Sequence, residues 1–106
     1  MDAQLKRGLL DVCVLSAILG EGSYGYKIIK DTNPYVSLSE STLYTILKRL
    51  ESGGLLTVRS VEYDGRLRKY YRITARGLAR LEDFKREWQE VMRIYQFVVK
   101  GENGNE

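Results

Sequence analysis

The chain has 106 residues, of which 43% are hydrophobic and 29% charged, with a formal net charge of +3. These values are typical of one folded soluble domain and exclude a disordered chain. With no histidine and one cysteine, the sequence excludes an intramolecular disulfide and histidine-based nucleophilic catalysis. Its first apolar run is too short to cross a bilayer. We therefore expect a cytoplasmic protein that is not an enzyme and uses no membrane, metal or cofactor.

The first predicted helix spans Leu5–Leu19 and closes at Gly20. Apolar residues surround much of its circumference, so the helix needs packing partners on two sides. One small domain supplies one of them, and we expect a second subunit to supply the other. Cys13 lies within this apolar run and is interpreted as a small buried hydrophobic residue, with a redox-sensing thiol as the alternative.

Two further helices are predicted before an extended region. The second covers Ser23 to about Asp31, with Ser23 as its N-cap, and it ends before Pro34. The third covers Glu40–Ser52 behind the N-cap Ser39. Its buried stripe follows helical spacing and consists of Leu43, Ile46, Leu47 and Leu50.

A β-hairpin follows the third helix. The predicted strands are Leu56–Tyr63 and Leu67–Ile73, and Asp64-Gly65 between them is a dipeptide favoured in two-residue turns. Because side chains alternate along a strand, one face of the second strand is expected to turn toward the core. That face carries Leu67, Lys69, Tyr71 and Ile73.

The last predicted helix runs from Ala75 to about Lys100 behind the cap Thr74, and the tail Gly101–Glu106 is expected to fray. One side of this helix carries an apolar seam with heptad spacing. The predicted dimerisation surface combines this seam with two leucines of the first helix: Leu9, Leu10, Leu81, Phe84, Trp88, Val91, Tyr95 and Val98.

The order of these elements is typical of a mainly α fold with a small β-hairpin, a winged helix-turn-helix with a long C-terminal helix. We assign residues 1–74 to the winged domain and 75–106 to the dimerisation helix and its short tail, the two forming one compact unit. An α-helix fits the major groove of DNA, and a hairpin reaches the flanking backbone. The element order therefore favours DNA binding.

The hairpin carries charge of one sign. Between Gly65 and Arg76 there are five cationic side chains and no acidic one, with Tyr70 and Tyr71 interleaved. A solvated strand usually mixes signs, so this pattern favours phosphate binding. The exposed face of the third helix adds hydroxyl groups and Lys48, which are donors to phosphates and base edges. The alternatives are an ordinary solvated helix face and a winged-helix interaction module whose hairpin binds an acidic protein.

An ordered set of short segments carries a family resemblance. The segments are Gly25–Ile29, Ser41–Glu51, Gly54–Leu56 and Arg68–Thr74, followed by Gly77. Together they resemble the PadR family of winged-helix regulators, in its short subfamily with one helix after the wing. The resemblance implies a homodimeric repressor that binds a palindromic operator in double-stranded DNA.

Family motif positions and the charge pattern together give the predicted DNA-binding set. It consists of Tyr26, Ser39, Ser41, Thr42, Tyr44, Thr45, Lys48, Arg66, Arg68, Lys69 and Tyr70. The resemblance also implies multidrug sensing, because some short members stack planar hydrophobic compounds on an aromatic residue at the dimer interface. Trp88, with Met92 beside it, lies at that place here, and structural packing is the alternative role for Trp88. A small aromatic inducer is therefore an expected partner, besides DNA and a second copy of the chain.

Overall fold

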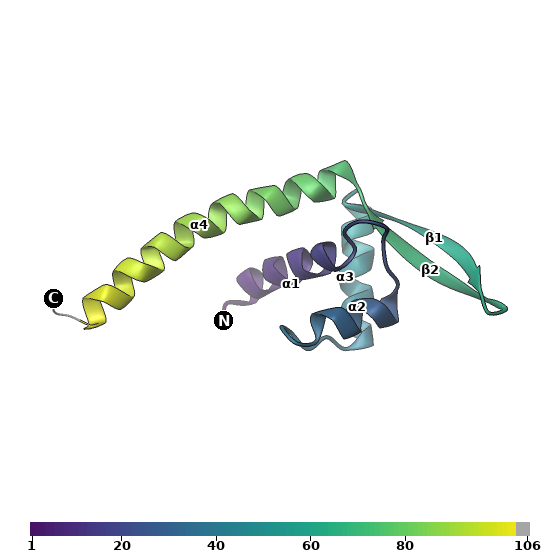
Figure 1. The fold of residues 1–106 in the computed structure, drawn as a ribbon, viewed down its shortest axis with the longest axis horizontal. Coiled ribbons are helices and arrows are strands. Elements are labelled where there is room, and N and C mark those ends of the chain that lie inside the picture. Colours follow the sequence, from purple (N-terminus) through teal and green to yellow (C-terminus); the bar gives the residue numbers. More distant parts are fainter. Residues whose placement is uncertain (104–106) are drawn as a thin grey trace.

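The computed structural model describes residues 1–103, which form four helices and one two-stranded antiparallel sheet. The elements in chain order are α1 (Ala3–Ala17), α2 (Gly25–Thr32), α3 (Glu40–Ser52), β1 (Leu56–Tyr63), β2 (Arg66–Ile73) and α4 (Ala75–Asn103). The bundle of α1, α2 and α3 lies in the middle, the hairpin projects from one end, and α4 extends in the opposite direction (Figure 1). The predicted winged helix with a long last helix is confirmed. Over residues 1–103, none of the helices combines the length and the apolarity that a membrane crossing requires.

The core lies where α1, α2, α3 and the base of the hairpin meet. The predicted stripe of α3 is buried, with each of its four side chains at most 3% exposed. Leu15 and Ile18 from the first helical segment and Ile28 from α2 are fully buried against it. Burial of this apolar surface is the main stabilising contribution to the domain.

Helix α1 begins and ends two residues before its predicted bounds. The Asp2 side chain caps it by accepting a hydrogen bond from the Leu5 N–H at 2.9 Å. The helix stops at Ala17, and Gly20, with φ of 78°, lies beyond its C-cap residue Ile18. Asp11, the one acid in the apolar run, is buried and pairs with Arg49 of α3, which explains how α1 tolerates a charge on its inner side.

The prediction that Ser23 caps α2 is wrong. The helix begins at Gly25 behind Tyr24, whose side chain makes no capping hydrogen bond. Ser23 pairs instead with β2: its N–H donates to the Tyr71 carbonyl at 3.0 Å, and the Tyr71 N–H donates back at 2.8 Å. The loop before α2 is therefore tied to the base of the hairpin.

The hairpin turn has the predicted geometry. Asp64 and Gly65 both have positive φ, 54° and 78°, as a two-residue turn of this type requires. β2 begins at Arg66, one residue before its predicted start. Tyr71 faces the core as expected and is 5% exposed, but Leu67 is 78% exposed; the prediction that it faces the core is wrong because the hairpin extends beyond the bundle.

Helix α4 leaves the hairpin at a tightly packed corner. The Thr74 hydroxyl accepts from the Gly77 N–H at 3.1 Å, which confirms its cap, and donates to the Gly54 carbonyl at 2.7 Å. A Cβ atom at Gly77 would lie 2.3 Å from the Leu55 carbonyl oxygen, so only glycine fits there. The helix continues to Asn103, so residues 101–103 are helical instead of frayed, and the remainder of the predicted tail, 104–106, lies outside the described residues.

Candidate DNA interface

One face of α3 is polar and exposed, opposite its buried stripe. Ser41, Thr42, Tyr44, Thr45 and Lys48 are all exposed, as the sequence predicts. Lys48 makes no hydrogen bond or ion pair with any other residue of the described chain. Its ammonium is therefore available to a phosphate or to a base edge.

Two hydroxyl groups at the start of α3 and within it already donate hydrogen bonds inside the protein. The Ser39 Oγ accepts from the Thr42 N–H at 3.2 Å and donates to the Thr42 Oγ1 at 2.9 Å, so Ser39 acts as the N-cap. The Thr45 hydroxyl donates to the Ser41 carbonyl at 2.9 Å. With these protons already used, Ser39 and Thr45 serve an outside ligand better as acceptors than as donors.

Tyr44 ties α3 to the start of α2. A Cβ atom at Gly25 would lie 2.7 Å from the Tyr44 Oη, so the absence of a side chain at Gly25 allows the phenol to pack there. The Tyr44 side chain is still 48% exposed, and Tyr26 on α2 is 75% exposed beside it. Two phenol groups from different helices thus share one surface.

The hairpin, called the wing from here on, presents cations on both faces. Arg66, Lys69 and Arg72 on β2 are exposed, although Lys69 lies on the face that was predicted to turn toward the core. The antiparallel register adds Arg59 of β1, which lies opposite Tyr70, and sequence reasoning missed it because only the second strand was considered. The same register places Glu62 opposite Leu67, so the wing as a whole is less uniformly charged than β2 alone.

A groove of about 810 Å³ separates the wing from the bundle. Five tyrosines line it: Tyr24 and Tyr26 from the α2 region, Tyr44 from α3, Tyr63 from β1 and Tyr71 from β2. The charged lining residues are Arg66, Arg68, Lys69 and Asp64. Five of the predicted DNA-binding residues thereby meet at one groove: Tyr26, Tyr44, Arg66, Arg68 and Lys69. The other six do not line it: Ser39, Ser41, Thr42, Thr45, Lys48 and Tyr70. Donors and aromatic rings around a cationic groove suit a nucleic acid backbone.

Arg68 differs from the other cations of the wing. Its guanidinium carbon lies 3.9 Å from the ring centroid of Tyr24 and 3.9 Å from that of Tyr63. Tyr24 also packs on Tyr70, with ring centroids 5.5 Å apart, so Tyr70 takes part in the packing of the wing. Sequence reasoning did not assign Tyr24 or Tyr63 to the site, since neither lies in a charged run and the contact joins distant segments.

The C-terminal half of α4 carries apolar side chains that remain exposed among the described residues. They range from 41% to 77% exposed: Val91, Met92, Ile94, Tyr95, Phe97 and Val98. Of the predicted dimerisation residues, Val91, Tyr95 and Val98 belong to this set. Leu81 does not, because it is 7% exposed and lies in the protomer's own core. Phe84 also packs partly against that core.

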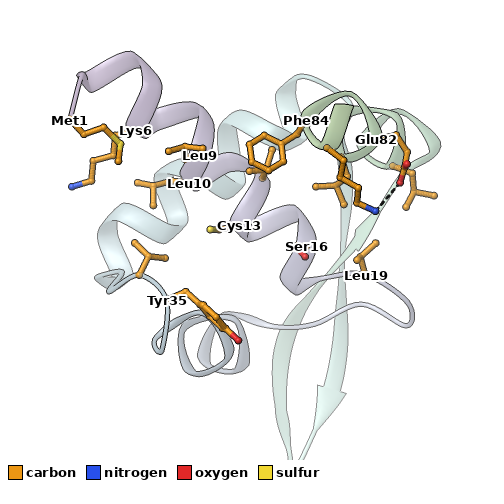
Figure 2. A pocket seen from close by; sticks show the side chains of 15 residues that line it. Met1, Lys6, Leu9, Leu10, Cys13, Ser16, Leu19, Tyr35, Glu82 and Phe84 are labelled. Carbon is orange, nitrogen blue, oxygen red and sulfur yellow. Dashed lines mark hydrogen bonds and ion pairs between the residues drawn. The ribbon is translucent and has the colours of Figure 1, made fainter. Parts of the chain in front are cut away.

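A hollow of about 630 Å³ lies between α1 and the first half of α4. Figure 2 shows Leu9, Leu10 and Cys13 from α1, Phe84 from α4, and Tyr35 from the loop after α2 around it. The two predicted leucines of α1 are thus half-buried beside an open apolar hollow. Burial raises the pKa of the Cys13 thiol, which lowers its thiolate fraction and argues against a redox role.

Trp88 is half-buried and stacks on Phe84, with ring centroids 5.6 Å apart at 25°. An open hollow of about 540 Å³ is lined by both rings and by Met92. The two residues predicted for ligand binding therefore lie together on one apolar surface, and one face of the indole already has an aromatic partner.

Comparison with known proteins gives the same assignment along most of the chain. Residues 14–83 match the family described as "Transcriptional regulator PadR-like family". An uncharacterized protein of Lysinibacillus sphaericus is 38% identical over 104 residues, which cover 93% of this chain and 95% of that protein. A crystal structure of a PadR family transcriptional regulator from Eggerthella lenta is 33% identical with a TM-score of 0.80, covering 92% of this chain and 87% of that one. A PadR-like transcriptional regulator from Bacillus cereus is 32% identical with a TM-score of 0.79, covering 92% and 98%.

The matched segment contains the whole wing, α3 and the corner where α4 begins. The similarity to solved regulators extends further, over more than nine-tenths of the chain. Family model, overall architecture and the arrangement of polar residues around the groove lead to one assignment. The chain belongs to the PadR-like family of transcriptional regulators.

Proposed function

We propose that this protein is a homodimeric repressor that binds a palindromic operator in double-stranded DNA. The observation that carries the proposal is the groove in which Tyr44, on the exposed face of α3, meets the wing cations Arg66, Arg68 and Lys69. In this proposal Ser41, Tyr44 and Lys48 enter the major groove. Arg66 and Lys69 bind phosphates beside it.

The uncovered half of α4 supports the dimer. Soluble monomers rarely keep a continuous apolar surface of this kind, and such a surface usually belongs to an interface. A second copy would place its own α4 against this face and against the hollow beside α1, which buries both at once. A two-fold pair then offers two copies of α3 to the DNA, and we expect half-sites about 10 bp apart or a multiple of that distance.

Titration with random duplex DNA at several salt concentrations tests the DNA-binding part of the proposal. We expect association with a dissociation constant of roughly 10⁻⁴–10⁻⁶ M that weakens steeply with salt. An acidic protein module in place of DNA is the other candidate partner for the wing. Binding that is absent at low salt would reject DNA and leave the acidic partner.

Selection of bound sequences from a random pool, followed by footprinting, tests the symmetry. The expected footprint has a dyad with equivalent half-sites. A protected region without a dyad, or a monomer at working concentrations in sedimentation equilibrium, would reject the proposed two-fold dimer.

A charge substitution on the wing gives a matched test of its role. Lys69→Ala is expected to weaken binding to all sequences and to lower the salt slope by about one. Arg86→Ala removes the same charge from α4, where Arg86 is exposed and paired with Asp83, and is expected to leave the slope unchanged. Equal slopes for the two variants would remove Lys69 from the interface.

Release of the repressor by a small hydrophobic or aromatic ligand is the last part of the proposal. It is supported by the hollow shared by Phe84, Trp88 and Met92. An aromatic cation added to the protein is expected to quench Trp88 fluorescence and to weaken DNA binding. Because the coupling is reciprocal, DNA should weaken binding of the aromatic cation by the same factor. Quenching with unchanged DNA affinity would leave a binding surface without a regulatory effect.

A further inference from the structure

The wing reaches beyond the bundle, and its orientation needs an explanation. A two-stranded hairpin is marginally stable in water on its own. The Ser23–Tyr71 bridge fixes only its base, while Tyr63, Arg66 and Leu67 near the turn are exposed. Without a further contact, the cations near the turn would have no fixed position relative to α3.

Arg68 supplies such a contact. Its guanidinium lies between the rings of Tyr24 and Tyr63, with 3.9 Å to each centroid. Tyr24 belongs to the segment that enters α2, and Tyr63 is the last residue of β1. A planar guanidinium stacks on two aromatic faces at once, which an ammonium does not do. The stack therefore joins the outer part of the wing to the bundle.

The chain of contacts continues to α3. Tyr24 is followed directly by Gly25, against which the Tyr44 phenol packs. Tyr44 lies on the exposed face of α3. Wing, α2 entry and α3 are thus linked through Tyr63, Arg68, Tyr24 and Tyr44 into one DNA-facing unit.

We propose that Arg68 is a positioning residue that fixes the wing against α2 and α3 through its two tyrosine partners, and that its charge is directed at those rings and not at a phosphate. This inference rests on the proposed DNA-binding function and deepens it. It replaces a phosphate contact at Arg68 by an indirect role, while Arg66 and Lys69 keep theirs. Loss of the Arg68 stack should therefore lower the affinity for DNA without removing an ionic contact to it.

The first experiment compares Arg68→Lys, Arg68→Met and Lys69→Met in DNA titrations at several salt concentrations. We expect both Arg68 variants to bind the selected operator about tenfold more weakly, as loss of two stacked faces implies. The salt slope should stay at the wild-type value for Arg68→Met and fall by about one for Lys69→Met. Wild-type affinity in Arg68→Lys, or a slope lowered by one in Arg68→Met, would overturn the proposal and assign Arg68 to a phosphate.

The second experiment changes the partner ring and leaves every charge in place. Tyr63→Phe keeps the ring and should bind DNA more tightly than Tyr63→Leu, which should lose part of the affinity that Arg68→Met loses. Because Arg68→Met already removes the contact with Tyr63, the double variant Tyr63→Leu with Arg68→Met should bind no more than about twofold more weakly than Arg68→Met alone. Additive losses would contradict the stack.

A readout without DNA separates this inference from the proposed function. In the free protein, the heteronuclear NOE of the Gly65 amide should fall in Arg68→Lys and Tyr63→Leu but not in Tyr63→Phe or Lys69→Met. Unchanged mobility in Arg68→Lys would overturn the positioning role even if DNA binds. Increased mobility in a protein that binds no DNA would uphold the stack and reject the function.

Discussion

The bundle of α1, α2 and α3 buries most of its large aliphatic side chains, whereas the C-terminal half of α4 leaves its own exposed to solvent. Leu15 and Leu43 are fully buried in the bundle, while Ile94 and Phe97 on α4 are 59% and 77% exposed. The same type of residue therefore serves two purposes in one chain. In the bundle it stabilises the protomer, and on α4 it is available to a partner.

The contrast also locates where the protomer ends as a folding unit. Contacts between α4 and the bundle involve its first half, through Leu81 and Phe84. Beyond Trp88 the residues up to Glu102 are exposed, except for the half-buried Val99. Substitutions on the two sides of this boundary are expected to affect different equilibria, folding on one side and association on the other.

The largest expected effect is in the closed region. Leu15→Ala should lower the free energy of unfolding by about 3 kcal/mol, because it removes a fully buried side chain and leaves a cavity. Leu19→Ala, at a position 46% exposed, is the control and should cost about 1 kcal/mol or less. Urea denaturation measures both. Equal losses would mean that the bundle is not closed as described.

A smaller effect on a different equilibrium is expected from α4. Tyr95→Glu should weaken dimerisation by about 2 kcal/mol, since it places a charge in an apolar interface. Gln96→Glu adds the same charge at a neighbouring polar position off the apolar seam and should change dimerisation little. Sedimentation equilibrium distinguishes them, and similar dissociation constants for the two variants would remove the seam from the interface.

Ser39, the N-cap of α3, is in the predicted DNA-binding set, but its main expected contribution is to the stability of the bundle. Ser39→Ala should cost about 1 kcal/mol of stability because Ser39 accepts the Thr42 N–H. Ser37→Ala changes another exposed serine, one with no such hydrogen bond among the described residues, and is expected to be neutral. Thermal unfolding of both variants checks the difference.

At neutral pH the smallest effect comes from Tyr71, at the junction of the bundle and the wing. Burial raises the pKa of its phenol, with smaller contributions from Tyr44 and Glu51. The folded state thus favours the neutral phenol, so its contribution is complete below the ordinary tyrosine pKa of about 10 and is lost as pH rises further. Between pH 7 and alkaline pH, the free energy of unfolding should fall less for Tyr71→Phe than for the wild type. Equal decreases in the two proteins would reject this assignment.

Local sequence signals were sufficient for the elements whose ends are marked by capping or turn residues. The cap Ser39 and the turn Asp64-Gly65 placed the start of α3 and the end of β1 at their observed positions. Each of these signals acts through residues a few positions away, so the sequence is sufficient to interpret it.

Errors occurred where a residue's partner is distant in the chain. Ser23 has the chemistry of an N-cap, but its backbone pairs with Tyr71. Leu67 alternates correctly with Tyr71 and Lys69, yet no core lies beneath it. For the site, the charge pattern of β2 was visible in the sequence, while the stacking of Arg68 between Tyr24 and Tyr63 depends on how two segments meet.

Gly77 shows how a property of the whole assembly can depend on a position that touches no ligand. The missing side chain lets α4 start close to the Leu55 carbonyl, and we expect this close approach to fix the angle at which the long helix departs from the wing. In a pair joined through α4, that angle is applied twice, once in each subunit. If the proposed dimer forms through α4, we expect this corner to set the length of operator that the pair spans. Gly77→Ala should then alter the preferred spacing between half-sites more than the bases read within them.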